Sequence, residues 1–194
     1  CLHASSTMVP VVGTWLESLL VPPPMRSLRI VCLSLLVASV QSASRYYSIK
    51  FTEVRSASKN WVKLGEIQFF DSTGAQITPT SGAYCTGDGG CSGSGYPISN
   101  AYDGSTSGDG WQDECFDGDS DDSTTSDRET HVVFTFSSAV TVWHYQFYRG
   151  TQFNSGRDPI SWTVYENPNS SPDCSGGMTI ATVSSFSAPT GRYE

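Results

Sequence analysis

The sequence is poor in charged residues, above all in basic ones. Charged side chains make up 15% of the 194 residues, below the quarter that is usual for a soluble domain, and 11 Lys and Arg stand against 19 Asp and Glu. The formal net charge is therefore −8 at pH 7. Such a chain offers no positive surface to a phosphate backbone, so we expect no nucleic-acid binding.

Signatures of catalysis are missing as well. The sequence contains no Gly-x-Ser-x-Gly elbow, no His-Glu-x-x-His pair and no phosphate-binding Gly-x-x-x-x-Gly-Lys-Ser loop. Its many Asp residues could supply a carboxylate pair for glycoside hydrolysis, but they cluster in one hydrophilic segment away from the aromatic strand ends. We therefore expect a protein that is not an enzyme.

Helical periodicity is the third absence. No stretch of about ten residues shows the 3.6-residue apolar period of a capped helix, whereas 18 Gly, 10 Pro and 12% aromatic residues fit short strands joined by polar turns. A turn is expected at 71–74 and a glycine-rich loop over 82–95. The expected fold class is all-β, a sandwich of two sheets that each bury one face. Strands are predicted over 46–54, 61–70, 131–136, 140–149, 160–166 and 178–183.

Residues 25–42 have the order of a secretory signal peptide. Two arginines follow Met25, an apolar run of eleven residues covers 30–40, and small residues come next. This run is too short for a bilayer, which needs about 20 residues, so a membrane anchor is the weaker alternative and we expect no membrane span. With cleavage after Ser42, the protein is expected to be secreted and extracellular.

The domain boundaries follow from this segment. Residues 1–24 begin with Cys and show no helical or strand period, so we interpret them as upstream sequence that is not native. After the signal peptide, residues 43–194 form one domain of ordinary size. The sequence stops at Glu194, about where a final strand is expected, so this domain is expected to lack its last strand.

Secretion leaves four cysteines in the mature chain. They are Cys85, Cys91, Cys115 and Cys174, an even number in an oxidising route, which predicts two disulfides. Four cysteines allow three pairings. The short, glycine-rich loop between Cys85 and Cys91 favours local closure, which leaves Cys115 for Cys174. A zinc site is disfavoured, because no Cys-x-x-Cys pair and no spaced histidine pair is present.

Acidic residues gather in one segment. Residues 100–130 hold ten acids and one base, a local charge of −9, while the rest of the chain is close to neutral. A cation is the natural partner for this segment. An EF-hand over 117–128 is excluded, since Asp122 stands where glycine is required and Arg128 where glutamate should chelate. The alternatives for this segment are a weak additional calcium site and a solvated loop.

Several segments, in their order along the chain, resemble the discoidin domain, also called the coagulation-factor C-type or galactose-binding-like domain. The resemblance covers about residues 46–193 and implies a non-catalytic jelly-roll β-sandwich whose long loops at one end bind a sugar, a lipid head group or a protein surface. The family's Gly-Ser-Asn-Asp-Gly turn is replaced here by residues 165–171, and residues 113–129 look like an acidic insertion. The matching segments are Tyr-Tyr-Ser-Ile-Lys-Phe (46–51), Val-Lys-Leu-Gly-Glu-Ile-Gln-Phe-Phe (62–70), Asn-Ala-Tyr-Asp-Gly-Ser-Thr (100–106) before Trp111, Val-Val-Phe-Thr-Phe (132–136), Val-Thr-Val-Trp (140–143) and Gly-Arg-Asp-Pro-Ile-Ser-Trp-Thr-Val (156–164).

The resemblance also implies a structural Ca²⁺ ion. Members of the family often hold calcium where the Asn-Ala-x-Asp-Gly loop meets the glutamate of the Leu-x-Glu-Ile strand. Calcium binds six to eight oxygens, which a turn can supply from carbonyls, a carboxylate and a hydroxyl. The alternative is a hydrogen-bonded Asx turn that closes the loop without metal. The expected metal residues are Glu66, Asn100, Asp103, Ser105 and Thr106.

Ligand binding in such a sandwich is expected from loop aromatics that stack on a sugar face and from polar side chains that fix its hydroxyls. The main candidates for this role are Tyr96, His144, Arg149 and Phe153, within a wider set that adds Trp61, Tyr84 and Phe116. Core packing is the alternative for each of them. Arg157 and Asp158 are expected to form an internal ion pair that braces the corner before Trp162.

The sequence therefore predicts a secreted, calcium-supported module that binds carbohydrate, with an extracellular glycan or another cell-surface ligand as its partner. The alternative function is an extracellular adhesion or protein-interaction domain, which could use the acidic segment.

Overall fold

The computed structural model describes residues 43–59, 61–85, 95–106, 110–114, 116, 129–149, 155–167, 174 and 177–187. The predicted upstream segment, the signal peptide and the acidic run over 117–128 lie outside these residues, as do Cys91, Cys115 and Phe153. Two short 3₁₀ helices, η1 (Ile98–Ala101) and η2 (Ser155–Arg157), are the only helices within the described ranges. The strands there are β1 (Ser44–Val54), β2 (Val62–Leu64), β3 (Glu66–Phe70), β4 (Gln76–Ile77), β5 (Ser81–Tyr84), β6 (Trp111–Asp113), β7 (Thr130–Val140), β8 (His144–Tyr148), β9 (Pro159–Asn167) and β10 (Met178–Val183).

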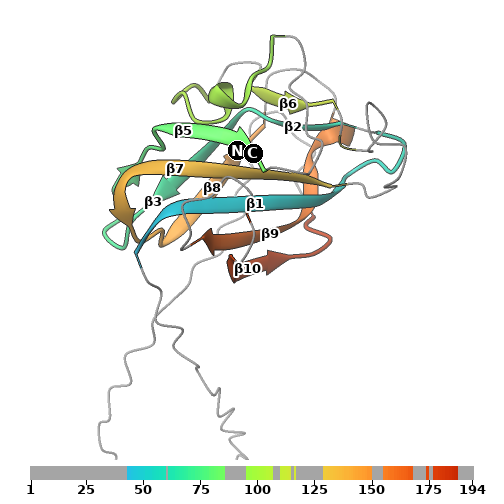
Figure 1. Ribbon diagram of the computed structural model, residues 1–194. Coiled ribbons are helices and arrows are strands. Elements are labelled where there is room, and N and C mark those ends of the chain that lie inside the picture. The colour runs from blue at the N-terminus through green and yellow to red at the C-terminus, as the bar shows by residue number, and fades with distance from the viewer. Residues whose placement is uncertain are drawn as a thin grey trace, which may run out of the picture.

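The strands form three antiparallel sheets. The largest has the order β10-β9-β1-β7-β5, so that the first strand of the chain lies in its centre and pairs with β7 on one side and β9 on the other. A three-stranded sheet has the order β4-β3-β8, and β2 pairs with β6. Figure 1 shows the five-stranded sheet across the front of the molecule, with β3 and β8 behind it.

Aromatic side chains join the two layers. Phe69 of β3 contacts Phe134 of β7, with 5.3 Å between ring centroids. Phe147 of β8 lies 5.0 Å from Trp162 of β9. The indole Nε1 of Trp162 donates a 2.8 Å hydrogen bond to the hydroxyl of Tyr145, which satisfies the polar atoms of two buried rings. The core therefore forms between the five-stranded and three-stranded sheets, as in a β-sandwich.

The all-β prediction is confirmed, and the two-residue apolar period predicted for the strand over 131–136 appears in β7. In β7, Val132, Phe134 and Phe136 are all at most 2% exposed, because alternate side chains of a strand point to the same face. The single strand predicted over 61–70 is wrong. The strand is interrupted at Gly65: β2, before it, pairs with β6, and β3, after it, pairs with β8. Within the described residues, no helix has the length and apolar character needed to cross a membrane.

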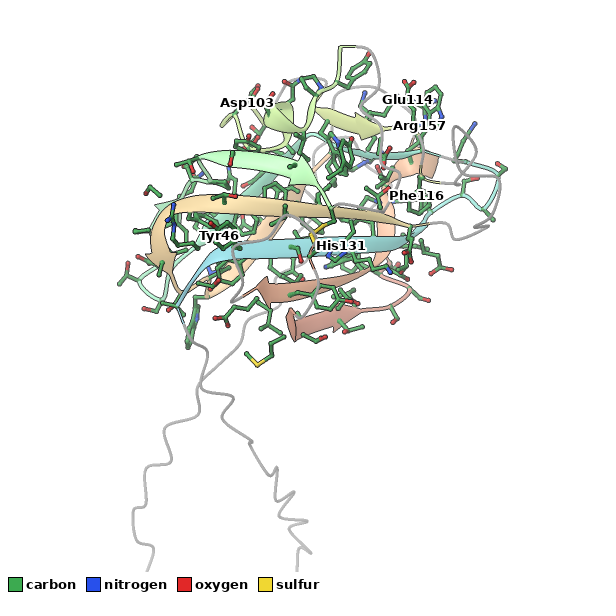
Figure 2. The ribbon with its side chains drawn as sticks, in the orientation of Figure 1. Tyr46, Asp103, Glu114, Phe116, His131 and Arg157 are labelled. Atoms are coloured by element: carbon green, nitrogen blue, oxygen red, sulfur yellow. A yellow bond between two sulfur atoms is a disulfide. The ribbon has the colours of Figure 1, made fainter. Side chains whose placement is uncertain are left out.

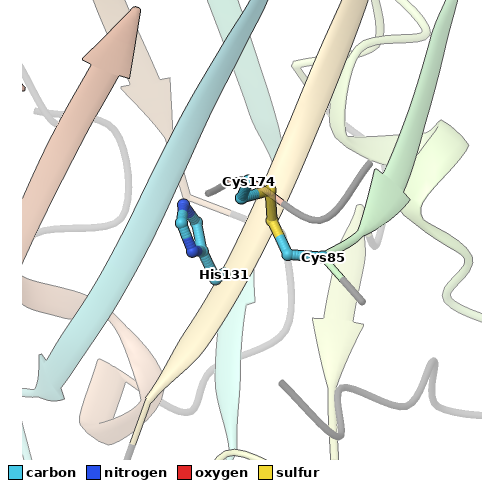
Figure 3. A group of neighbouring side chains, drawn as sticks. All are labelled: Cys85, His131 and Cys174. Atoms are coloured by element: carbon cyan, nitrogen blue, oxygen red, sulfur yellow. A yellow bond between two sulfur atoms is a disulfide. The ribbon is translucent and has the colours of Figure 1, made fainter. Parts of the chain in front are cut away.

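The predicted cysteine pairing is wrong. Cys85 forms a disulfide with Cys174, 89 residues further along the chain, and their Cα atoms are 5.5 Å apart, a usual distance for such a bond. Cys85 follows β5 at one edge of the five-stranded sheet, and Cys174 belongs to the connection between β9 and β10, the two strands at the opposite edge. Cys174 nevertheless lies over the face of the sheet beside His131 of β7, within reach of Cys85 (Figure 3). Sequence proximity favoured closure with Cys91, whereas the path of the β9–β10 connection decides the pairing.

Candidate functional site

The loop after η1 meets the first residue of β3. The Glu66 side chain, in a residue only 1% exposed, accepts a 3.0 Å hydrogen bond from the backbone N–H of Gly104 through Oε1. Its second oxygen, Oε2, is buried and has no hydrogen-bond partner. Asp103 accepts a 2.7 Å bond from the backbone N–H of Ser105, which is an Asx turn. The loop thus places a second carboxylate next to a buried one.

Burial dominates the electrostatics of Glu66. The pKa of its carboxyl is raised to about 7, mainly by loss of solvation and also by the neighbouring charge of Asp103, while the hydrogen bond from the Gly104 backbone opposes the shift. Two carboxylates that share a site repel each other unless a proton or a cation lies between them. An oxygen-binding cation would relieve this repulsion, and Ca²⁺ is the cation that prefers such oxygen ligands.

A second group of side chains lies at the end of the sandwich formed by β2 and β6. The Arg157 guanidinium lies over the Trp61 ring, 4.0 Å from its centroid, and the Lys63 ammonium lies 4.4 Å from the centroid of Tyr96. Figure 2 labels two members of this group, Glu114 and Arg157, near β6. We call the whole group the loop-end cluster; it consists of Trp61, Lys63, Tyr96, Gln112, Glu114 and Arg157.

Hydrogen bonds order the loop-end cluster. Arg157 donates to the Gln112 carbonyl oxygen Oε1 at 2.9 Å, and Gln112 donates through Nε2 to Glu114 at 2.8 Å. Burial lowers the pKa of Arg157, an effect that the charge of Glu114 opposes. The Arg157 Nε is buried and has no hydrogen-bond acceptor among the described residues. The cluster therefore keeps a fixed donor next to two half-buried aromatic rings.

Asp158 belongs to a different contact. It forms ion pairs with Arg149 at 3.0 Å and with Arg55 at 3.2 Å. Burial raises the pKa of Asp158 to about 6, although the two arginines oppose the shift. Because Arg55 follows β1 and Arg149 follows β8, this carboxylate joins three segments of the fold. The expected ion pair between Arg157 and Asp158 is wrong, since Arg157 contacts Gln112 and Trp61 instead.

Comparison of the chain with protein-family models, with curated proteins and with solved structures gives no match.

Of the predicted metal residues, the structure brings Glu66 and Asp103 together. Asn100 lies on η1, and its amide Nδ2 donates a 3.2 Å hydrogen bond to the carbonyl oxygen of Gly110. Ser105 contributes the backbone N–H of the Asx turn, and Thr106 is exposed at the end of the same loop. The observed contacts therefore join Glu66, Asp103 and Ser105, whereas the Asn100 side chain is directed to Gly110.

The predicted ligand-binding residues are not brought together as one set. Tyr96 lies in the loop-end cluster. Arg149 is turned into the ion pair with Asp158, and its side chain is only 11% exposed. His144 is the first residue of β8, and its ring stacks on that of Phe70 with 4.4 Å between ring centroids. At 3.3 Å per residue along the strand, His144 lies about 16 Å from Arg149. His144 therefore lies at the other end of the sandwich.

The wider set divides between site and core. Trp61 belongs to the loop-end cluster, but Phe116 is fully buried and the Tyr84 hydroxyl accepts a 2.8 Å bond from the Trp111 indole. Sequence reasoning did not single out Lys63, Gln112 or Glu114. Lys63 alternates with Val62 and Leu64 in a strand whose residues are all buried, so its pattern gave no sign of a site.

Proposed function

We propose that the chain is a secreted, non-catalytic binding module of the discoidin type that recognises extracellular carbohydrate through loops at one end of its β-sandwich. The observation that supports it most is the loop-end cluster. There, two half-buried aromatic rings and hydrogen-bonding side chains from four segments far apart in the sequence converge at the end of β2 and β6.

The chemistry of this cluster suits a sugar. A pyranose presents a C–H face that stacks on Trp or Tyr, and a rim of hydroxyls that need donors and acceptors. Trp61 and Tyr96 supply rings, and Glu114 and the Arg157 guanidinium supply polar atoms. The buried Gln112 holds these two side chains in place through hydrogen bonds to both. A preordered arrangement of this kind lowers the entropy lost on binding.

A Ca²⁺ ion is part of the proposal, and the residues present fit it. The observation that supports the fit is Glu66 Oε2. This carboxylate oxygen lies beside the Asp103 side chain, is buried, and accepts no hydrogen bond from the described residues. Glu66 and Asp103 would hold the ion, together with carbonyl or hydroxyl oxygens of the loop over 100–106. The ion would neutralise two adjacent carboxylates and fix the loop to β3.

A glycan array in calcium buffer tests the function. We expect binding to selected sugars, with affinity nearly the same at low and high salt, because a neutral ligand has no charge to screen. Trp61→Ala and Tyr96→Ala should weaken that binding at least tenfold. His144→Ala is the matched control, since it removes a half-buried ring at the other end of the sandwich and should leave sugar affinity unchanged.

The array also distinguishes carbohydrate binding from the alternative function, an adhesion or protein-interaction domain that uses the acidic segment. If no glycan bound, and a cationic protein bound in a salt-dependent way that was lost on neutralising Asp119, Asp121 and Asp122, the carbohydrate proposal would be replaced by recognition through the acidic segment.

A further inference from the structure

The side chains of Cys85, His131 and Cys174 meet on one face of the five-stranded sheet. Figure 3 shows the two bonded sulfurs beside the imidazole, which projects from β7. One potential ligand atom from each residue lies within 4.8 Å of the other two, and all three residues are at most 8% exposed. The three residues come from separate parts of the fold. Cys85 follows β5, His131 is near the start of β7, and Cys174 lies between β9 and β10.

The contacts around His131 hold its ring in place. Its Nε2 lies 2.9 Å from the Ser48 hydroxyl of the neighbouring strand, and its ring lies 5.4 Å from that of Tyr165 on β9. A histidine that ligates a metal through one ring nitrogen commonly hydrogen-bonds through the other. Burial, with a smaller contribution from Lys50, lowers the pKa of His131 to about 4, so the ring is neutral at pH 7 as metal binding requires.

A tetrahedral zinc site would need the two sulfurs further apart than they are in the disulfide. Zn–S bonds of about 2.3 Å and a Zn–N bond of about 2.0 Å place neighbouring ligand atoms about 3.5 to 3.8 Å apart. Reduction frees the two sulfurs to separate, and the group from which they start already lies within 4.8 Å. The backbone N–H of Cys85 also donates a 2.9 Å hydrogen bond to the His131 carbonyl, which ties the two ligand positions together.

We propose that, once the Cys85–Cys174 disulfide is reduced, Cys85, Cys174 and His131 bind one Zn²⁺ ion. Two thiolates and an imidazole select a borderline-soft cation over Ca²⁺ or Mg²⁺. The ion is neutralised by the two thiolates, and a water molecule takes the fourth position, as in other sites with three protein ligands. The inference is independent of the carbohydrate proposal.

The redox step balances with a phosphine as reductant. The phosphine and one water molecule reduce the S–S bond to two thiols, and the phosphine is oxidised to its oxide. Zn²⁺ then displaces the two thiol protons, which pass to the buffer. The same two sulfur atoms form either the disulfide or the two bonds to zinc, so the oxidised and metal-bound forms exclude each other.

Cobalt titration tests the site, because Co²⁺ bound to thiolates gives sulfur-to-cobalt charge-transfer bands and its visible bands report tetrahedral geometry. The full chain is used with Cys1, Cys32, Cys91 and Cys115 replaced by Ser, so that only this pair of thiols remains. After phosphine reduction we expect one Co²⁺ per chain, displaced by one Zn²⁺. The oxidised protein should give no such bands.

The ligand role of His131 has its own control. His131→Gln should lower the cobalt affinity about 100-fold, whereas His144→Gln, another strand histidine, should not change it. Near-ultraviolet circular dichroism of the reduced chain, with and without Zn²⁺, covers the case in which reduction unfolds the domain. The proposal predicts that Zn²⁺ restores the folded signal or raises Tm. It is overturned if the reduced chain gives no charge-transfer bands and no metal-dependent gain in folding, or if His131→Gln binds cobalt as tightly as its parent.

Discussion

The carboxylate of Glu66 accepts a 3.0 Å hydrogen bond from the backbone N–H of Gly104, 38 residues further along the chain. This bond fixes the loop after η1 to the first residue of β3. It also leaves Glu66 Oε2 buried beside Asp103 with no donor of its own. Whether this pair of carboxylates carries a cation decides how the domain responds to calcium.

Glu66→Gln should stabilise the domain without calcium and remove its response to calcium. In chelator at pH 8 the variant should be more stable than the parent by about 1 to 3 kcal/mol, since a buried amide costs less than a buried carboxylate. At a free Ca²⁺ concentration of ten times Kd, the parent should gain about 1.4 kcal/mol and the variant nothing. Thermal melts in the two buffers measure both effects.

Asp103→Ala, together with a control variant, distinguishes the contribution of metal binding to stability from that of the hydrogen-bonded turn that Asp103 closes. The variant should lose the calcium-dependent rise in Tm. Asp71→Ala is the matched control, because Asp71 closes a similar exposed turn by accepting from the backbone N–H groups of Thr73 and Ala75. It should keep the full calcium response. Equal melting of the parent in calcium and chelator would mean that the loop is closed by hydrogen bonds alone.

Gly110→Ala should destabilise the fold by more than about 3 kcal/mol. Gly110 has φ +67°, and a Cβ there would overlap the carbonyl oxygen of Leu64 and lie 2.5 Å from the Cα of Gly65. Gly74→Ala is the control, since it has φ +82° but open space around the added methyl group. It should cost only about 1 kcal/mol, as the strain of a left-handed residue alone. Urea unfolding measures both, and similar losses would contradict the close approach.

Replacing Cys85 and Cys174 by Ser should cost about 4.6 kcal/mol on the chain-entropy account, because the bond closes a loop of 89 residues. Serine at Cys91 and Cys115 should leave that bond intact. Mass spectrometry of unreduced peptides identifies the pairs directly. A peptide that joins Cys85 to Cys91 would contradict the observed connectivity.

His131 should make the oxidised protein less stable in acid. Its pKa falls from 6.5 in the unfolded chain to about 4 in the fold, so the unfolded state binds the proton first and stability is lost as pH falls from about 6.5 to about 4. The loss amounts to up to about 3 kcal/mol. The groups that face the ring are Lys50, Glu129 and Tyr165.

The raised pKa values of Glu66 and Asp158 act in the opposite direction over part of this range, so the parent must be compared with His131→Gln at each pH. The free energy of unfolding of the parent, measured relative to that of His131→Gln, should rise steadily as pH rises to about 6.5. His144→Gln should follow the parent. A difference that does not depend on pH would show that the buried ring has an ordinary pKa.

Local pattern was enough to predict most strands of this fold. The strand predicted over 178–183 coincides with β10, and the alternation in β7 marked its buried face, because both depend only on neighbouring side chains. The short strands β4, β5 and β6 were not predicted. Two to four residues are too few to show a period, and these strands are defined by their partners.

Long-range contacts could not be predicted from local pattern. The position of β1 between β7 and β9 and the approach of His131 to Cys85 follow from sheet order. The disulfide depends in addition on the path of the connection between β9 and β10, which brings Cys174 to Cys85. For the candidate site, the loop motif identified Glu66 and Asp103 correctly as neighbours. It could not indicate that Arg149 would pair with Asp158, because that pairing depends on where β8 ends.

The bond between Cys85 and Cys174 also governs what a protease can release. Peptide bonds between these two residues, including those of the acidic segment, lie inside a covalently closed ring. A single cut there opens the ring but leaves one molecule, whose pieces migrate together on a gel until a reductant is added. The central strand β1 and the edge strand β10 would then stay attached to each other after cleavage, so a nicked domain can keep its five-stranded sheet assembled.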